Sequence, residues 1–109
     1  MTNRSQPASD CHFLVICRSH GRIDPESRLQ SQRLKWLESL RLAEILLMSG
    51  PSRDRTLSIC VIKAENSDEA RNIMKGDPLH RAWQSAEVIE WEIHAGAPSD
   101  WSGQAKDVR

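Results

Sequence analysis

Short apolar segments alternate with polar ones along this chain, and their lengths and periods predict four strands. Residues 11–18 (CHFLVICR) are apolar on both alternating faces, which is typical of a strand that is covered on both sides. Residues 45–51 (ILLMSGP) and residues 57–65 (LSICVIKAE) predict two further strands joined by a short hairpin. Residues 86–94 (AEVIEWEIH) alternate strictly, so we expect a half-buried last strand with Trp91 on its apolar side.

A first helix is predicted between the first two strands. Asp24-Pro25-Glu26 supplies a capping oxygen, a proline at the first helical position and a first-turn acid, so we expect the helix to run from here to residue 43 or 44. Arg33 occupies a position on the apolar side of this helix, so its charge is expected to point toward the protein. The other members of that side are Leu29, Trp36, Leu37 and Leu40.

A second, shorter helix is predicted after the third strand. Asn66 followed three residues later by Glu69 resembles a capping box, and Gly76-Asp77-Pro78 is a typical stop signal. The expected buried side of this helix consists of Ala70, Ile73 and Met74.

The resulting order, β-α-β-β-α-β, is the split pattern of an α+β, ferredoxin-like fold. Right-handed crossovers then predict the sheet order last, first, third, second strand, with both helices on one face. The other face of the first and third strands remains apolar. Because such a patch is rare on a soluble monomer, we expect a second copy to cover it and form a homodimer.

Length and composition limit the classes of protein that remain. With 109 residues, there is room for one domain, which we place at residues 11–95 after a flexible leader at residues 1–10. We expect residues 96–109 to form a polar tail, which is either disordered or docks Trp101 on a partner subunit. Fifteen basic residues balance fifteen acidic ones, which argues against nucleic-acid binding. No apolar run or signal peptide indicates a membrane, so we expect a cytoplasmic protein.

Standard cofactor and redox motifs are missing from the sequence. The three cysteines form no C-x-x-C pair, and two of them lie within apolar runs, so we expect reduced core residues. The sequence contains no glycine-rich phosphate loop and no zinc-ligand spacing. We therefore expect neither a metal nor a cofactor, and a small molecule as the ligand.

The predicted topology brings several polar residues to one edge of the sheet. A carboxylate beside an imidazole makes a general base that works near neutral pH, so Asp77 with His80 or His20 is a candidate pair. Alternatively, Asp77 caps the second helix and forms a structural ion pair with Arg33. The polar residues expected at this edge are Arg18, Ser19, His20, Arg33, Asp77 and His80, and Leu79 lies among them.

The tryptophans also allow two interpretations. Trp83 follows the Asp77 segment closely and can line a pocket by stacking on a flat ligand, or it is plain packing. Trp36 and Trp91 lie on apolar faces and are expected in the core.

Four stretches, which together span roughly residues 11–95, resemble the YCII-related (YciI-like) family. They are CHFLVICRS, SRLQSQRLKWLESLRLAEILLMSGP, LSICVIKAENSDEARNIMKGDPL and AEVIEWEIH. The resemblance implies a subunit that pairs into a dimeric α/β barrel, with a cleft around a histidine and an aspartate. It also implies chemistry of the kind found in one branch of the family, which dehydrochlorinates chlorinated hydroxyhydroquinones in aromatic compound degradation; related barrels isomerise muconolactones.

One position departs from the family pattern. The family aspartate corresponds to Asp77, but the expected histidine is replaced by Arg33. Arginine stays protonated at any working pH, so it cannot accept a proton as imidazole does. Three possibilities follow: the base has moved to His80 or His20; or Asp77 is the base while Arg33 binds an anionic oxygen; or the chain binds a ligand without turnover.

The main hypothesis is therefore a cofactor-independent lyase or isomerase that is dehydrochlorinase-like. It would abstract a proton from a small oxygenated cyclic or aromatic compound, with Asp77 and His80 or His20 as the base system and Arg33 stabilising negative charge. The expected substrate-binding residues are Arg18, Ser19 and Trp83. The alternative is a non-catalytic ligand-binding or accessory dimer of the same fold, which predicts a closed Arg33–Asp77 ion pair without a cavity beside it.

Overall fold

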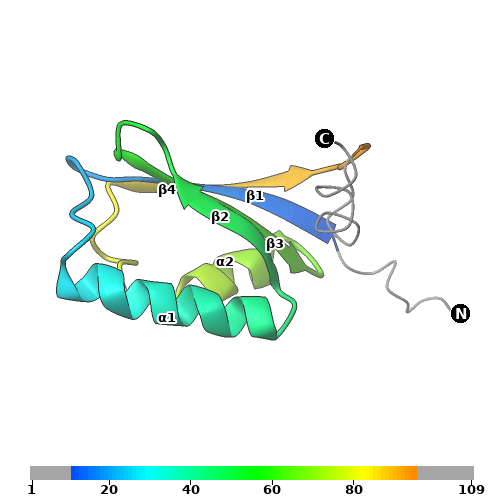
Figure 1. The fold of residues 1–109 in the computed structure, drawn as a ribbon. Helices are drawn as coiled ribbons and strands as arrows, with labels where there is room; N and C mark the ends of the chain where they lie inside the picture. The colour runs from blue at the N-terminus through cyan, green and yellow to red at the C-terminus, as the bar shows by residue number, and fades with distance from the viewer. Residues whose placement is uncertain (1–10, 96–109) are drawn as a thin grey trace, which may run out of the picture.

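A four-stranded antiparallel sheet covered on one face by two helices forms the fold (Figure 1). The computed structural model describes residues 11–95. In chain order the elements are β1 (Cys11–Arg18), α1 (Arg28–Leu42), β2 (Leu46–Pro51), β3 (Leu57–Ala64), α2 (Ser67–Met74) and β4 (Ser85–Trp91). The sheet order is β2-β3-β1-β4, which confirms the predicted ferredoxin-like arrangement. The leader at residues 1–10 and the tail that carries Trp101 lie outside the described residues.

Helix α1 begins later than predicted. Ser27 is its N-cap, and the Ser27 hydroxyl accepts a 3.0 Å hydrogen bond from the backbone N–H of Gln30. Asp24 Oδ1 accepts instead from the backbone N–H of Glu26, at 3.0 Å, within the turn that precedes the helix. The prediction of a start at Asp24-Pro25 was wrong because this carboxylate stabilises the turn, while Ser27 supplies the cap.

Helix α2 begins as predicted. Asn66 is the N-cap, and its side-chain oxygen accepts a 2.8 Å hydrogen bond from the Glu69 N–H. The Glu69 carboxylate accepts in turn from the backbone N–H of Glu65, at 2.6 Å, one residue before the usual capping-box donor. Ala70 and Met74 are buried on the inner side of the helix, as expected.

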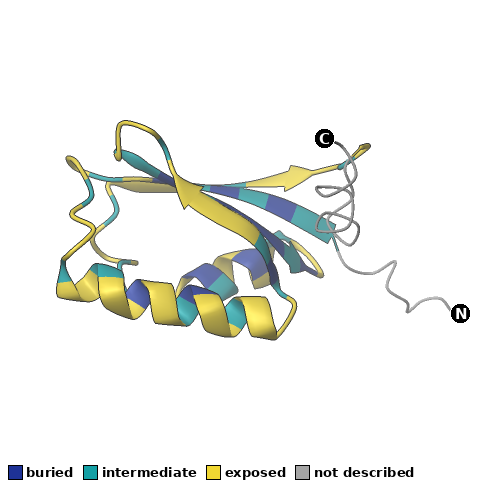
Figure 2. Ribbon diagram, viewed as in Figure 1, coloured by how far each residue is buried: buried dark blue, intermediate teal, exposed yellow. Residues whose placement is uncertain are grey.

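The hydrophobic core lies between the helices and the sheet, where Figure 2 shows buried segments on the central strands and on the inner sides of both helices. Cys17 and Cys60 are buried there, and burial raises the pKa of Cys17 to about 11 and that of Cys60 to about 12. Both thiols therefore stay protonated near neutral pH, as expected for core cysteines. The remaining strand and helix residues of this core include Phe13, Val15, Ile62, Ala64, Leu37 and Met74.

The opposite face of the sheet is apolar and has no helix over it within residues 11–95 (Figure 1). Leu14 and Ile16 alternate with the buried residues of β1, and the register places Ile89 and Trp91 of β4 beside them. Ile89 is 39% exposed and Trp91 is 42% exposed. The prediction that Trp91 lies in the core was therefore wrong for a single chain, because its face of the sheet is uncovered.

Two further expectations concern α1 and membrane helices. Leu29, expected on the buried side of α1, is exposed because the helix begins only one residue before it. Trp36 is half-buried against the core, in line with the prediction. In the part of the chain that the structure describes, no helix has the length and apolar character needed to cross a membrane.

Candidate functional site

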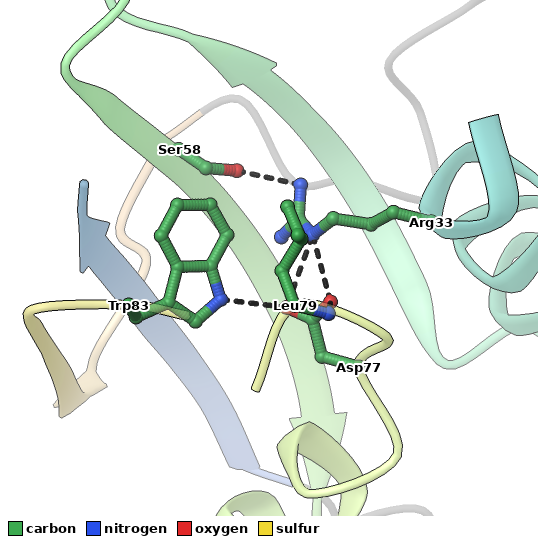
Figure 3. A network of polar contacts seen from close by, with 5 residues as sticks. All are labelled: Arg33, Ser58, Asp77, Leu79 and Trp83. Carbon is green, nitrogen blue, oxygen red and sulfur yellow. Dashed lines mark hydrogen bonds and ion pairs between the residues drawn. The ribbon is translucent and has the colours of Figure 1, made fainter. Parts of the chain in front are cut away.

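A buried ion pair joins helix α1 to the segment that follows α2 (Figure 3). Arg33 is 3% exposed and Asp77 is 4% exposed. Arg33 Nε donates to both carboxylate oxygens of Asp77, at 3.1 Å to Oδ1 and 3.0 Å to Oδ2. The inward orientation predicted for Arg33 is confirmed, and the pair is closed, as the ligand-binding alternative requires.

Two further donors complete the surroundings of the Asp77 carboxylate. The backbone N–H of Leu79 donates to Oδ1 at 2.8 Å, and Trp83 Nε1 donates to Oδ2 at 2.9 Å. With Arg33 Nε, three donor groups engage both oxygens, which occupies most of the lone pairs of a carboxylate. This geometry favours Asp77 as a group that positions Arg33 and Trp83 rather than as a direct proton acceptor.

The remaining guanidinium nitrogens of Arg33 differ in their surroundings. Nη1 donates to the hydroxyl of Ser58 on β3, at 2.9 Å. The guanidinium carbon lies 5.1 Å from the centre of the Trp83 ring, within the range of a cation–π contact. Nη2 is buried and has no hydrogen-bond partner within residues 11–95.

Gly76 allows Asp77 to come this close to α1. A Cβ atom on Gly76 would lie 3.2 Å from Trp36 Nε1, closer than nearly all Cβ contacts. The stop signal after α2 therefore also lets this segment lie against Trp36 of α1, next to Asp77, which bonds to Arg33.

An apolar cavity of about 200 Å³ lies between α2 and the strands β1 and β4. Cys17, Met74 and Val88 form its buried or half-buried floor, and Trp83 and Asp77 form the wall toward Arg33. The other lining residues are Ala86 and three exposed basic residues at the mouth, Arg71, Lys75 and His80.

A polar cavity of about 300 Å³ lies on the other side of the ion pair, between α1 and the strands β2 and β3. Arg33 and Ser58 line its inner end, together with Gln30, whose buried Oε1 also has no hydrogen-bond partner among the described residues. The remaining lining residues are Ile23, Pro25, Leu34, Leu37, Ser49, Gly50, Pro51 and Arg55. No Asp or Glu of the described chain lines this cavity.

Three of the predicted site residues are joined directly, and a fourth lies close by. Arg33, Asp77 and Trp83 share the contacts described above. His80 lines the apolar cavity with Asp77, and its backbone N–H donates to the Asp77 carbonyl at 2.8 Å. Within residues 11–95 the His80 ring makes no hydrogen bond to the Asp77 carboxylate.

The residues at the end of β1 do not meet this group. Arg18 and His20 are exposed and make no side-chain hydrogen bond in the described range. Alternation along β1 puts Arg18 on the sheet face opposite to Cys17, away from the helices. Ser19 accepts a 3.3 Å hydrogen bond from the Gly21 N–H and lines a hollow of about 140 Å³ that Trp83 also reaches.

Two polar residues of the site were not foreseen. Ser58 lies on the helix-covered face of the apolar strand β3, two residues before Cys60 and four before Ile62 on the same face. A hydroxyl group at a buried position of an apolar strand could have indicated that Ser58 belongs to the site. Gln30 lies three residues before Arg33 on α1, so both side chains share one face of the helix. The described residues contain no group of three or more His, Cys, Asp or Glu side chains that could hold a metal ion.

Comparison with known proteins places this fold in a family. A family model of the YCII-related domain matches residues 11–92. Solved structures that match include the 5-chloro-2-hydroxyhydroquinone dehydrochlorinase (TftG) from Burkholderia phenoliruptrix AC1100 in complex with 2,5-dihydroxybenzoquinone. Its TM-score is 0.59 at 21% identity, over 76% of this chain and 95% of that one, a likeness that concerns the fold.

No curated protein matches the chain. The family-model match, however, extends over most of the sequence and includes Arg33, Asp77 and His80. The chain belongs to the YCII-related domain family.

Proposed function

We propose that this protein is an enzyme that removes a proton from a small oxygenated cyclic or aromatic compound bound in the apolar cavity, followed by elimination or isomerisation. The observation that carries this proposal is the cavity itself. It combines an apolar floor, the ring of Trp83, and an imidazole at its mouth, beside the buried Asp77. Such a mixture of apolar lining and a few convergent polar groups is typical of small-molecule sites.

The size of the apolar cavity fits one substituted ring. Its volume is about 200 Å³, and an apolar cavity of roughly 150 Å³ is known to bind benzene. The Trp83 ring, fixed by its bond to Asp77, offers a flat wall for stacking. The similar solved dehydrochlorinase holds 2,5-dihydroxybenzoquinone, a ring of this class, which supports the proposed class of substrate.

His80 is the proposed proton acceptor. Imidazole is the side chain that both accepts and releases protons near neutral pH. His80 lines the cavity, and within residues 11–95 no hydrogen bond occupies its ring. Asp77 acts as a positioning residue, because its oxygens already hold Arg33, Trp83 and the Leu79 N–H.

The proposed elimination is balanced without an external oxidant. A chlorinated hydroxyhydroquinone reacts as its keto tautomer, in which a hydroxyl proton has moved to the carbon that bears chlorine. His80 takes the proton of a second ring hydroxyl group, the O–H electron pair forms a C=O bond, the ring double bond shifts, and chloride leaves with the electrons of the C–Cl bond. The organic product is the corresponding hydroxyquinone. Lys75 and Arg71 at the mouth are placed to stabilise the negative charge that develops.

A second candidate function is ligand binding without turnover by the same fold. The closed Arg33–Asp77 ion pair favours it, because this pair leaves Asp77 no free oxygen for chemistry. The cavity beside the pair was not expected on this alternative.

The deciding experiment is chloride release from 5-chloro-2-hydroxyhydroquinone by the wild-type chain, His80→Gln and His94→Gln. His94 is an exposed histidine three residues beyond the end of β4 and serves as the matched control. We expect His80→Gln to lose roughly 10²- to 10⁴-fold in kcat, the usual contribution of a general base, while His94→Gln retains wild-type turnover. Binding of the compound without chloride release would favour the second candidate, and full activity of His80→Gln would refute the base assignment.

We also infer that a second copy of the chain covers the open face of the sheet. The inference rests on the exposed apolar side chains there, which include Met48, Ile89 and Trp91. Ile89→Glu should shift the chain from dimer to monomer in sedimentation velocity, whereas Glu90→Gln on the same strand should leave the dimer intact. A wild-type chain that sediments as a monomer at micromolar concentration would contradict the inference.

A further inference from the structure

The mouth of the apolar cavity is basic, although the chain as a whole carries no net charge. Arg71, Lys75 and His80 line the cavity, and all three residues are exposed. Most of the other lining residues are apolar and form the floor and walls. Positive charge is therefore concentrated at the open end of an apolar interior.

The lining of the apolar cavity holds no negative charge that would neutralise these basic groups. Within the described chain, Asp77 is the only acidic lining residue, and its two oxygens are already engaged by three donor groups. The Cys17 thiol on the floor stays neutral, because burial raises its pKa to about 11. A ligand that enters the cavity therefore meets a positively charged mouth.

Arg71 and Lys75 lie on one side of α2. Residues four apart on a helix are neighbours, and two like charges at this spacing repel each other slightly. Arg71 pairs with Asp68 at 3.8 Å, but both side chains are exposed, and such a pair contributes little. Lys75 makes no ion pair within residues 11–95. Both cations are therefore available to an anion placed between them, which would also relieve their repulsion.

The acidic residues of β4 do not reduce this positive charge within the cavity. Ala86 and Val88 line the cavity, so alternation places Glu87 on the opposite face of the sheet. Glu90 shares the face of Val88, but it lines a different hollow, near the start of β1. The strand that forms one wall therefore contributes no carboxylate to the cavity.

We propose that the ring compound of the apolar cavity carries a carboxylate, which Arg71 and Lys75 bind at the mouth. The ring lies on the apolar floor against Trp83, and the charged group stays at the open end, where it avoids the cost of burial. A guanidinium group bonds to both oxygens of a carboxylate, and the lysine ammonium adds a point charge. His80 then remains available for proton transfer.

This proposal deepens the proposed function and rests on it for the presence of a ring in the cavity. The two proposals fail on different results, because the ring and its charge are tested by different compounds. Absence of binding by hydroquinone and other neutral rings would refute the ring site itself. Neutral rings that bind as tightly as their carboxylates would refute only the carboxylate. A carboxylate preference without turnover of any compound would favour the second candidate function.

The test is an NMR titration of the full chain with two compounds of similar shape. Benzoate carries the charge, benzamide is its neutral counterpart, and the Trp83 indole N–H reports on the binding of both. At low ionic strength we expect benzoate to bind about 3- to 10-fold more tightly than benzamide, the effect of two exposed charge contacts. In about 1 M salt, where the Debye length is about 3 Å, this preference should fall to roughly 2-fold or less.

Variants of the two basic residues assign the preference. Arg71→Gln combined with Lys75→Gln should bind benzoate and benzamide with equal affinity, and its affinity for benzamide should match that of wild type. The matched control combines Arg53→Gln with Lys35→Gln, which removes the same charge from exposed positions that do not line the cavity, and it should keep the wild-type preference. Thermal unfolding checks that both double variants are folded.

A filling variant checks that both compounds bind in this cavity. Ala86 lines the cavity and pairs with Cys17 across the strands, so Ala86→Leu should narrow it and weaken benzoate and benzamide alike. The proposal is overturned if wild type binds the two compounds equally or binds neither up to millimolar concentration. It is equally overturned if the two double variants show the same preference, or if Ala86→Leu binds benzoate as tightly as wild type.

Discussion

The two cavities beside the Arg33–Asp77 pair differ in lining, although they share one wall. The apolar cavity has Cys17, Met74 and Val88 as its floor and a histidine at its mouth, and the only carboxylate among its lining residues is Asp77, whose oxygens are engaged. The polar cavity is lined by Arg33 and Arg55, and no residue of the described chain that lines it is acidic. The proposed proton acceptor and the basic lining thus lie on opposite sides of the pair.

This difference shows what an arginine does at position 33, where the resemblance to the family implies a histidine. A histidine at this position could accept a proton from a ligand beside Asp77. The longer arginine instead bonds to both Asp77 and Ser58, and it lines the polar cavity. Burial of both charges is offset by the additional bonds from Leu79, from Trp83 and to Ser58. The ion pair lies between the two cavities.

Replacement of Asp77 should have the largest effect on stability. Asp77→Ala leaves the Arg33 charge buried and unpaired and also leaves the Trp83 and Leu79 donors unsatisfied. We expect it to lower the free energy of unfolding by about 3–5 kcal/mol, measured by urea denaturation. The control is Asp68→Ala, whose carboxylate is exposed and lies 3.8 Å from Arg71, with an expected change of about 0.5 kcal/mol or less. Equal losses in the free energy of unfolding for the two substitutions would show that the buried Arg33–Asp77 pair contributes no more to stability than an exposed ion pair.

Trp83→Phe tests how much the hydrogen bond between Trp83 and Asp77 contributes to stability. The phenyl ring retains most of the apolar contact but cannot donate to Asp77 Oδ2. We expect a loss of about 1.5–3 kcal/mol in the free energy of unfolding, the range for a hydrogen bond to a charged group. Trp91→Phe, on the open face of the sheet, should cost less, because within residues 11–95 the Trp91 indole makes no hydrogen bond that the substitution would remove. A larger loss at Trp91 would reverse the ranking of the two regions.

Thiol reactivity distinguishes the cavity cysteine from the core cysteine. Cys17 lines the apolar cavity and Cys60 does not, but burial raises the pKa of Cys17 to about 11 and that of Cys60 to about 12. At pH 8 we expect both thiols to react with a disulfide reagent far more slowly in the folded chain than in urea, with Cys17 the faster of the two. Mass spectrometry of the labelled chain measures this order. Faster labelling of Cys60 would show that the apolar cavity does not admit the reagent.

The smallest effect is expected at the turn beside the polar cavity. Hydrogen bonds from Thr56 and Ser52 lower the pKa of Asp54 from 3.8 to about 2. Because the folded value is the lower one, the stabilising contribution of Asp54 is complete above about pH 4 and is lost as the pH falls through about 2. Carbon-detected NMR titration of the Asp54 carboxyl checks the midpoint, and Asp54→Asn should remove the pH dependence of the adjacent Arg55 signals. A midpoint near 4 would contradict the hydrogen-bonded turn.

Much of the fold was readable from local patterns, while the division of the site was not. Short apolar runs of strand length in residues 11–18 and 57–65 identified the two central strands, and the Gly76-Asp77-Pro78 stop located the aspartate. The helix start was misplaced because Asp24 and Ser27 are both good caps, and the choice between them depends on the turn that precedes the helix. Arg33 was expected to face inward because it falls on an apolar helical face.

The two cavities depend on contacts between segments that are far apart in the sequence. Ser58 is 25 residues from Arg33 and Asp77 is 44 residues from it, so the sequence contains no local signal for which nitrogen of the guanidinium meets which partner. The topology places His20, Arg18 and Asp77 at the same edge of the sheet. Their side chains nevertheless do not meet, because Arg18 and His20 are exposed to solvent while Asp77 is buried.

The most direct test of the apolar cavity as the ligand site is an NMR titration of hydroquinone into the wild-type chain. The Trp83 indole N–H reports on the apolar cavity, and the Arg33 Nε–H reports on the ion pair beside it. We predict saturable binding that shifts mainly the Trp83 signal, because the Trp83 ring lines the cavity. Saturable binding that leaves the Trp83 signal unchanged, or no binding up to millimolar concentration, would contradict the account.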